Sequence, residues 1–246
     1  MKKVNLDRIK NYPWDLEFAE KQTYEMCIEA IEEDGLLLKD VRWDELNLDK
    51  EQIYNLYLKA VNEDGLALEY IEEQTERICL IAVKQNGLAL EYVKEQTEEI
   101  CIEAVREYYL SLEFVIEQTP KICMEAVGHD GLAIQFVENQ TEEICREALK
   151  QDKDAIKYVI DKEKYLEEFN IKYLKEQGNA SEVIAIEKDG EWLFTVGCQD
   201  NITKETFIDR IYNTDGGFDP EKRINTHRKR YLKFLKSFNN SKRAIC

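Results

Sequence analysis

The residues best suited to chemistry in this sequence are cysteines that recur at a fixed interval. They stand 22 positions apart, each followed three positions later by an alanine: Cys79, Cys101, Cys123 and Cys145. Thiolates bind zinc, which takes four ligands at about 2.3 Å. Equivalent side chains of stacked helices are about 8–10 Å apart, too far for a shared metal ion or a disulfide. We therefore predict buried thiols that act as small apolar residues, and no metal site.

A cysteine and a histidine outside this series are the other candidates for catalysis. Cys198 follows a predicted strand and His227 lies in a basic segment. A neighbouring imidazole can activate a thiol as a nucleophile. No nucleophile elbow, phosphate-binding glycine loop or metal-ligand cluster accompanies them. A weak Cys/His hydrolase is therefore an alternative, and we expect a protein that is not an enzyme and has no cofactor.

The cysteine series belongs to a 22-residue repeat, Gln-Thr-x-x-x-Cys-x-x-Ala-x-x-x-x-Gly-Leu-x-Leu-x-Tyr. A fixed period of this length is typical of stacked-repeat proteins. The threonine can cap an α-helix whose apolar residues share one face, and a shorter second helix follows the glycine. Helices this short need neighbours, so the predicted fold is mainly α, an α-solenoid of short helix pairs. The repeated alanine marks six units: Ala30, Ala60, Ala82, Ala104, Ala126 and Ala148.

Two other repeated positions carry structural expectations. We expect Gly65 and its equivalents to provide a left-handed residue at the end of the first helix. Tyr109 and Lys153 replace this glycine in two units, where the turn should be less favourable. An aromatic residue closes the second helix of most units, and we assign this series to the core: Phe18, Tyr70, Tyr92, Phe114, Phe136 and Tyr158.

The array is irregular in the middle and at its ends. An eight-residue insertion around Trp43 lengthens the spacing between Ala30 and Ala60 to 30, and it is either a binding loop or a packed elbow. The chain enters through a half-repeat and leaves through a polar helix predicted around Glu163–Gln177, as capping ends require. We therefore assign residues 1–176 to the helical array.

The repeats resemble a family of short helical repeats, known mostly from bacteria and some protists, that is described as a domain of unknown function. Its signature, Ala-Val…Asp-Gly-Leu-Ala-Leu-x-Tyr-Val, stands here as the segment from Ala60 to Ile71. The resemblance covers about residues 12–160. It implies the solenoid fold and no particular activity, and the C-terminal quarter of the chain lies outside it.

The C-terminal segment, residues 177–246, predicts a small α+β domain. Asp189-Gly190 between two apolar runs is a strong hairpin signal. A helix is expected after Thr203, and a basic helix from Glu221 to about Phe238. We therefore expect a β-hairpin plus two helices.

Charge is distributed unevenly along the chain. The sequence has 51 acidic and 34 basic residues, a net charge of −17, yet the segment from Asp219 onward carries +7. Such acidity argues against attraction of the array to nucleic acid or membranes. A glutamate just before the repeated alanine forms either a solvated face or an acidic surface for a basic partner: Glu29, Glu103, Glu125 and Glu147. The basic helix supplies the remaining candidate partner-binding residues: Arg223, His227, Arg228, Arg230 and Lys233.

We predict that the arginines and the lysine of this helix contact carboxylates, of the array or of a partner, with nucleic acid as the alternative. The whole pattern favours a protein–protein interaction module, an adaptor or regulator that binds its partner on the acidic repeat surface. The alternative from another class is an acidic decoy or inhibitor that occupies a basic, nucleic-acid-binding groove of another protein. We expect a protein partner and no nucleic acid, and we predict no oligomeric state.

The location of the protein follows from the apolar pattern and the cysteines. No apolar run approaches the ~20 residues that span a bilayer, and the first residues lack the apolar region of a signal peptide. Seven cysteines, an odd number placed mostly at core-like positions, suit a reducing compartment. We therefore expect a cytoplasmic protein without membrane association, and the composition favours a bacterial or phage origin.

Overall fold

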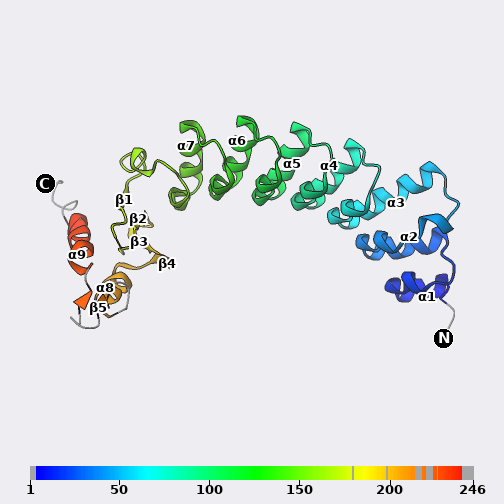
Figure 1. Cartoon of the computed structure of the whole chain (residues 1–246), viewed down its shortest axis with the longest axis horizontal. Helices are drawn as coiled ribbons and strands as arrows, with labels where there is room; N and C mark the ends of the chain where they lie inside the picture. The colour runs from blue at the N-terminus through cyan, green and yellow to red at the C-terminus, as the bar shows by residue number, and fades with distance from the viewer. Residues whose placement is uncertain are drawn as a thin grey trace. The chain divides into compact units, whose positions relative to one another are not determined.

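The computed structural model describes residues 4–178, 180–197, 199–213, 218–219, 224–225 and 227–239. The chain divides into two compact units, residues 1–158 and 159–246. The first unit is a row of helices and the second contains a β-sheet (Figure 1). The predicted class is confirmed: a mainly α solenoid with a C-terminal α+β part. The boundary lies N-terminal of the one expected from sequence, because residues 159–176 belong to the second unit.

In the first unit, α-helices alternate with short 3-10 helices. The α-helices are α1 (Leu6–Asn11), α2 (Tyr24–Glu33), α3 (Lys50–Glu63), α4 (Glu76–Gln85), α5 (Glu98–Glu107), α6 (Pro120–His129) and α7 (Glu142–Gln151). The 3-10 helices are η1 (Pro13–Phe18), η2 (Gly35–Asp40), η3 (Trp43–Glu45), η4 (Gly65–Tyr70), η5 (Gly87–Tyr92), η6 (Tyr109–Phe114), η7 (Gly131–Phe136) and η8 (Lys153–Lys157). The second helix of each repeat is thus a tight 3-10 helix. The threonine caps are confirmed; Thr97 Oγ1, for example, accepts from the Ile100 amide at 3.4 Å. The six repeated alanines are fully buried.

The repeated glycines serve close packing rather than a left-handed turn. The prediction of a left-handed residue is wrong, because φ at Gly65 lies outside that region. A Cβ atom at Gly65 would instead lie 2.3 Å from the carbonyl oxygen of Ala82 in the next α-helix, well inside any permitted contact. Lys153 occupies this position in the last repeat, and there no further α-helix of the array follows. Tyr109 also occupies it, in a unit that α6 follows, so the close approach of the next α-helix explains the glycines that are present but does not require glycine in every unit.

A repeated glutamine ties each unit to the next. The Nε2 atom of Gln96 donates to the carbonyl of Phe114 at 2.8 Å, and its Oε1 atom accepts from the amide of Ile116 at 3.0 Å and from Sγ of Cys101 at 3.6 Å. The donation to the carbonyl 18 residues on recurs at Gln22, Gln74, Gln118 and Gln140. We call this series the glutamine spine.

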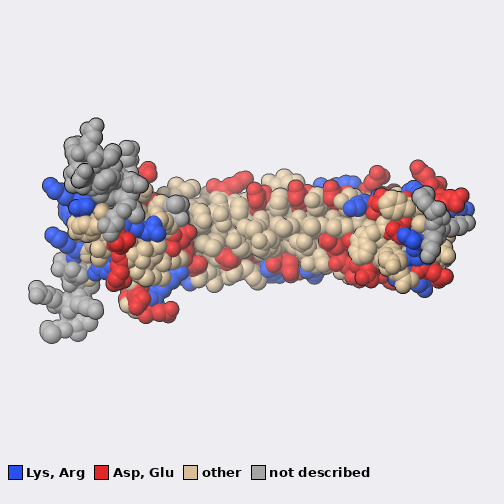
Figure 2. All heavy atoms as spheres, turned by 90° about the horizontal axis from the view of Figure 1, so that it is seen from below, with Lys and Arg blue, Asp and Glu red and all other residues tan. Residues whose placement is uncertain are grey.

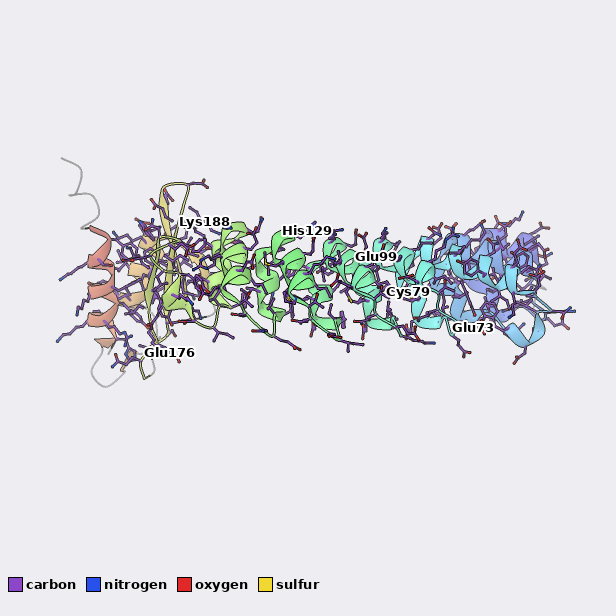
Figure 3. The ribbon with its side chains drawn as sticks, turned by 90° about the horizontal axis from the view of Figure 1, so that it is seen from above. Glu73, Cys79, Glu99, His129, Glu176 and Lys188 are labelled. Carbon is purple, nitrogen blue, oxygen red and sulfur yellow. The ribbon has the colours of Figure 1, made fainter. Side chains whose placement is uncertain are left out.

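The cysteines are buried as predicted, but they are hydrogen-bond donors to the spine rather than only apolar filling. The described cysteines are free thiols, and Cys79 lies inside the array (Figure 3). Burial raises the pKa of Cys101 to about 11 and that of Cys27 to about 12. A thiol with the ordinary pKa of 9.0 is already protonated at neutral pH, and burial extends to higher pH the range in which these thiols can donate.

None of the aromatic residues assigned to the core is fully buried. Phe18 is 67% exposed and Tyr158 is 42% exposed, whereas the other members are half-buried. The core is formed instead by the residues between them and the α-helices, such as Ala67 and Leu68, which are fully buried. The core assignment of these rings is therefore wrong.

The second unit contains an antiparallel sheet in the order β1-β2-β3-β4. The strands are β1 (Ile171–Leu174), β2 (Val183–Lys188), β3 (Glu191–Val196) and β4 (Gln199–Ile202). The predicted hairpin is β2–β3, whose turn residues Asp189 and Gly190 have φ of 51° and 82°. Helices α8 (Lys204–Asn213) and α9 (Arg228–Lys236) cover a core that includes Phe194, Phe207 and Tyr231. Two helices are present as predicted, the second with a later start, and the sheet is larger than the predicted hairpin.

Two details of the second unit differ from prediction. The helix expected around Glu163–Gln177 is wrong, because that segment holds the 3-10 helix η9 (Lys162–Lys164) and strand β1. The basic helix begins at Arg228, later than expected, and is preceded by the short strands β5 (Phe218–Asp219) and β6 (Ile224–Asn225). The 3-10 helix η10 (Ser237–Asn239) follows it. Among the described residues, no helix has the length and apolar character needed to cross a bilayer.

Candidate functional site

The four glutamates proposed as an acidic surface are half-buried and ion-paired within the array. The guanidinium of Arg106 lies 3.1 Å from Glu103 in α5 and 3.0 Å from Glu125 in α6. Its hydrogen bond lowers the pKa of the Glu125 carboxyl. The other contacts are Lys84–Glu103 at 3.3 Å, Lys10–Glu29 at 3.4 Å and Lys150–Glu147 at 3.1 Å. These carboxylates thus link side chains of the array and offer a partner little unpaired charge.

The insertion around Trp43 is a packed elbow. It forms η3, and the half-buried Trp43 ring packs edge-on against Tyr57 of α3, with centroids 5.5 Å apart and planes at 66°. Arg42 stabilises the elbow by an ion pair with Glu45 at 3.1 Å. Trp43 therefore supports the wall of α3, where Tyr57 stands at the position that cysteine occupies in the regular repeats.

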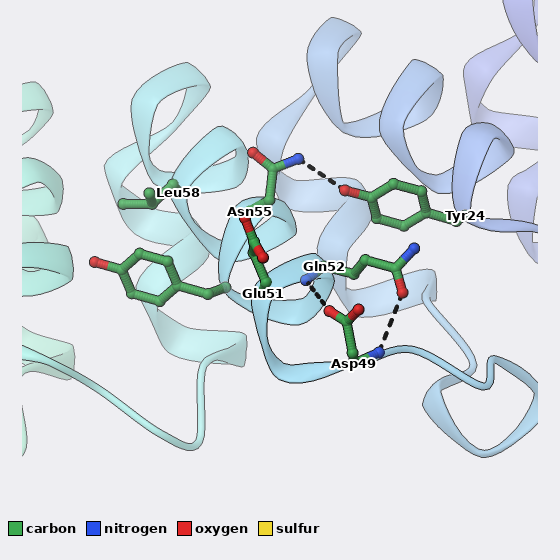
Figure 4. A pocket seen from close by; sticks show the side chains of 7 residues that line it. Tyr24, Asp49, Glu51, Gln52, Asn55 and Leu58 are labelled. Carbon is green, nitrogen blue, oxygen red and sulfur yellow. Dashed lines mark hydrogen bonds between the residues drawn. The ribbon is translucent and has the colours of Figure 1, made fainter.

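The insertion also interrupts the glutamine spine. Helix α3 has an additional turn at its start, capped by Asp49, whose Oδ1 atom accepts from the Gln52 amide at 2.9 Å. Gln52 precedes Ala60 by the same interval that separates Gln74 from Ala82. Its Oε1 atom, however, accepts from the Asp49 amide at 3.1 Å and completes the capping box (Figure 4). The side chain that would tie this unit to the next is therefore used within its own helix.

Three adjoining cavities form a groove at this irregular repeat, along the first turns of α3, α4 and α5. The first, about 380 Å³, lies between Tyr24 of α2 and α3, where Asn55 donates to the Tyr24 hydroxyl at 2.8 Å (Figure 4). The second, about 570 Å³, shares Tyr54 with the first and is also lined by Tyr57. The third, about 550 Å³, shares the segment 73–75 with the second and reaches Ile100. We call the three together the α3–α5 groove.

The α3–α5 groove combines aromatic walls with carboxylates. Six acidic side chains and two lysines line it. None of the six acids has an ion-pair partner among the described residues, and four of them also accept no hydrogen bond through their carboxylates there: Glu51, Glu72, Glu73 and Glu95. Burial raises the pKa of Tyr57, and the charges of Glu73 and Glu72 raise it further. Acidic side chains outnumber the lysines, so the groove has a net negative charge. Glu73 is exposed at the edge of the array (Figure 3), so this charge is accessible to solvent.

The two arginines at the start of α9 contact uncharged groups. Arg228 lies 4.5 Å over the Tyr212 ring, and Arg230 donates to Gln177 and to the Lys175 carbonyl. Lys233 is exposed, and the His227 ring is 6.5 Å from that of Tyr231. Arg223 and Cys198 lie outside the described residues. The predicted contact of Arg223 with carboxylates and that of Cys198 with His227 therefore stay predictions.

No group of three metal-ligating side chains occurs in the described part of the chain. The sequence pointed to the insertion but not to the α3–α5 groove. The available signal was the capping box at Asp49, which removes Gln52 from the spine, together with tyrosine in place of cysteine at Tyr57.

Three segments of the chain, residues 54–96, 75–118 and 120–163, match the model of a family described as Domain of unknown function (DUF4116). The matched segments follow one another in tandem, as the 22-residue repeat predicts. No curated protein and no solved structure matches the chain with significance.

Proposed function

On the premise that residues 54–118 and 120–163 are repeats of this family, we propose that the chain is a non-enzymatic protein-interaction module. Its partner contributes an extended basic segment that binds in the α3–α5 groove. The observation that carries this proposal is a set of three cavities that share lining residues, two of them lined by tyrosines and all three by carboxylates without ion-pair partners among the described residues.

The groove suits an extended chain better than a small molecule. Its cavities adjoin along three successive helix starts, so a ligand that fills them must be elongated. A side chain with an aliphatic stem and a cationic end can pack on Tyr54 and reach Glu51 or Glu73. Because these charges are solvent-exposed, binding should weaken as salt shortens the Debye length from about 8 Å at physiological ionic strength.

The groove also favours this function over an acidic decoy. A decoy that used the glutamates before the repeated alanines would need them unpaired, whereas Glu103, Glu125 and Glu147 are ion-paired. The free buried thiols support a location in a reducing compartment, and on that ground we propose the cytoplasm.

The test uses a fluorescein-labelled peptide that alternates arginine and leucine, titrated with the full chain at several salt concentrations. The double variant Glu51→Gln/Glu73→Gln should weaken binding by about fivefold, since exposed ion pairs contribute about 0.2–1 kcal/mol each. The control Glu103→Gln/Glu147→Gln makes the same change in net charge outside the groove and should have little effect. Equal weakening by both variants, or no binding by the wild type, would refute the proposal.

A further inference from the structure

The 3-10 helices present a second surface, distinct from the α3–α5 groove. The aromatic residue that closes each 3-10 helix and the leucine that precedes it by four positions are both partly exposed. We call this series the aromatic strip: Leu66, Tyr70, Leu88, Tyr92, Leu110, Phe114, Leu132 and Phe136. Phe18 and Tyr158, with 67% and 42% exposure, extend it at either end. One face of the array in Figure 2 is uncharged along its middle, with acidic residues along its edges.

The geometry of the 3-10 helix explains why these side chains face solvent. In η4, Ala67 and Leu68 are fully buried, which leaves Leu66 and Tyr70 on the outer side. Successive 3-10 helices pack against one another, so each repeat adds one ring to the strip. An exposed glutamate stands immediately before the ring in three of these helices: Glu69, Glu91 and Glu113.

The spacing of the rings selects the conformation of a ligand. Packed helices generally lie about 8–10 Å apart, and on that ground we expect successive rings to recur at about that interval. A polyproline II helix has three residues per turn and rises 3.1 Å per residue, so every third residue returns to the same side after about 9.3 Å. A β-strand returns to the same side every two residues, about 6.7 Å, which does not match.

We propose that the aromatic strip binds a proline-rich segment in the polyproline II conformation that carries arginine or lysine. Rings that face solvent bind proline through its apolar surface, and this helix loses little conformational entropy on binding because it is preformed. The glutamates beside the rings are the complementary charges for basic residues placed once per turn. The strip thus has a ligand class different from that of the α3–α5 groove.

The experiment compares two labelled peptides of equal charge, (Pro-Pro-Arg)₅ and (Gly-Ser-Arg)₅, binding to the full chain. The first forms polyproline II and the second is a flexible coil. We expect the proline peptide to bind at least about tenfold more tightly. The variant Tyr92→Ala/Phe114→Ala should abolish this preference, while the groove variant Glu51→Gln/Glu73→Gln should retain it. Urea unfolding of each variant verifies that the array is intact.

Each other outcome overturns the inference. Equal affinity for the two peptides would mean that charge alone is recognised. Loss of binding only in the groove variant would place the peptide in the α3–α5 groove, and the proposed function would stand. Self-association in analytical ultracentrifugation that Tyr92→Ala/Phe114→Ala abolishes would identify a second copy of the chain as the occupant of the strip.

Discussion

The glutamine spine can be tested by removing one side chain, Gln96→Ala. In the structure this residue makes two short hydrogen bonds to the backbone of the next repeat, at 2.8 Å to the Phe114 carbonyl and 3.0 Å to the Ile116 amide. Its contacts with Leu90 and Cys101, at 3.5 and 3.6 Å, are longer and contribute less. Alanine removes all four contacts and leaves the backbone groups of residues 114 and 116 without protein partners.

The expected loss of stability follows from these two short bonds. An intramolecular hydrogen bond contributes about 1 kcal/mol net, and an unsatisfied buried group costs about 1–3 kcal/mol. Ile116 is 79% exposed, and we therefore expect the loss at its amide to stay near the lower value. We therefore expect Gln96→Ala to lower the free energy of unfolding by about 2–3 kcal/mol.

Urea unfolding of the full chain measures this effect, with unchanged m-values as the condition for comparison. The matched control is Gln135→Ala, because Gln135 is exposed and its amide donates only to Leu132 within the same 3-10 helix, at 3.0 Å. It should change stability by less than about 0.5 kcal/mol. Hydrogen exchange at the Ile116 amide should accelerate in Gln96→Ala alone. If the two variants unfold alike and exchange alike, the spine does not couple the repeats.

Three further predictions concern packing and titration. Gly65→Ala should destabilise the protein by about 1–3 kcal/mol, because the new Cβ would lie 2.3 Å from a carbonyl oxygen. Gly128 lies in open space within α6, and Gly128→Ala should stabilise the protein by about 0.5–1 kcal/mol. Thermal denaturation compares the two variants. Burial raises the pKa of Cys101 to about 11 from an ordinary value of 9.0, so between these pH values the folded state keeps a proton that the unfolded state loses. The contribution of this thiol to stability should therefore fall as pH rises through that range. The free energies of unfolding of wild type and Cys101→Ala, measured with urea, should converge there. The lowered pKa of Glu125 contributes stability above its ordinary value of 4.5 that is lost at lower pH, and Arg106→Gln should return the pKa toward that value in an NMR titration.

The sequence predicted those parts of the array that depend on local chemistry. Threonine caps act within one helical turn, and the alanines repeat with the helices, so both appear in the period itself. The spine was missed for a physical reason. Gln96 binds the backbone of residues 114 and 116, and since every residue supplies a carbonyl and nearly every residue an amide, no side-chain pattern marks its partners.

Other errors arose where the local sequence has more than one structural explanation. A left-handed turn and a close interhelical approach both require glycine, so Gly65 was recognised for the wrong reason. Strand β1 was predicted as helix because its Lys- and Glu-rich surroundings favour helix formation locally, whereas pairing of Ile171 with Ile186 decides the outcome. The α3–α5 groove was missed because its lining residues come from several successive units, and no local sequence pattern shows that they adjoin.

The short reach of the glutamine spine has a consequence for how such a chain can change over evolutionary time. Each tie joins a side chain to backbone atoms 18 and 20 residues further on, so it never extends beyond the adjoining unit. None of these hydrogen bonds depends on the total number of units in the array. A duplication or loss of one complete unit, such as residues 97–118, would present every remaining glutamine with the same backbone geometry. Copy number can therefore drift by recombination, while the irregular unit at α3 can be inherited unchanged.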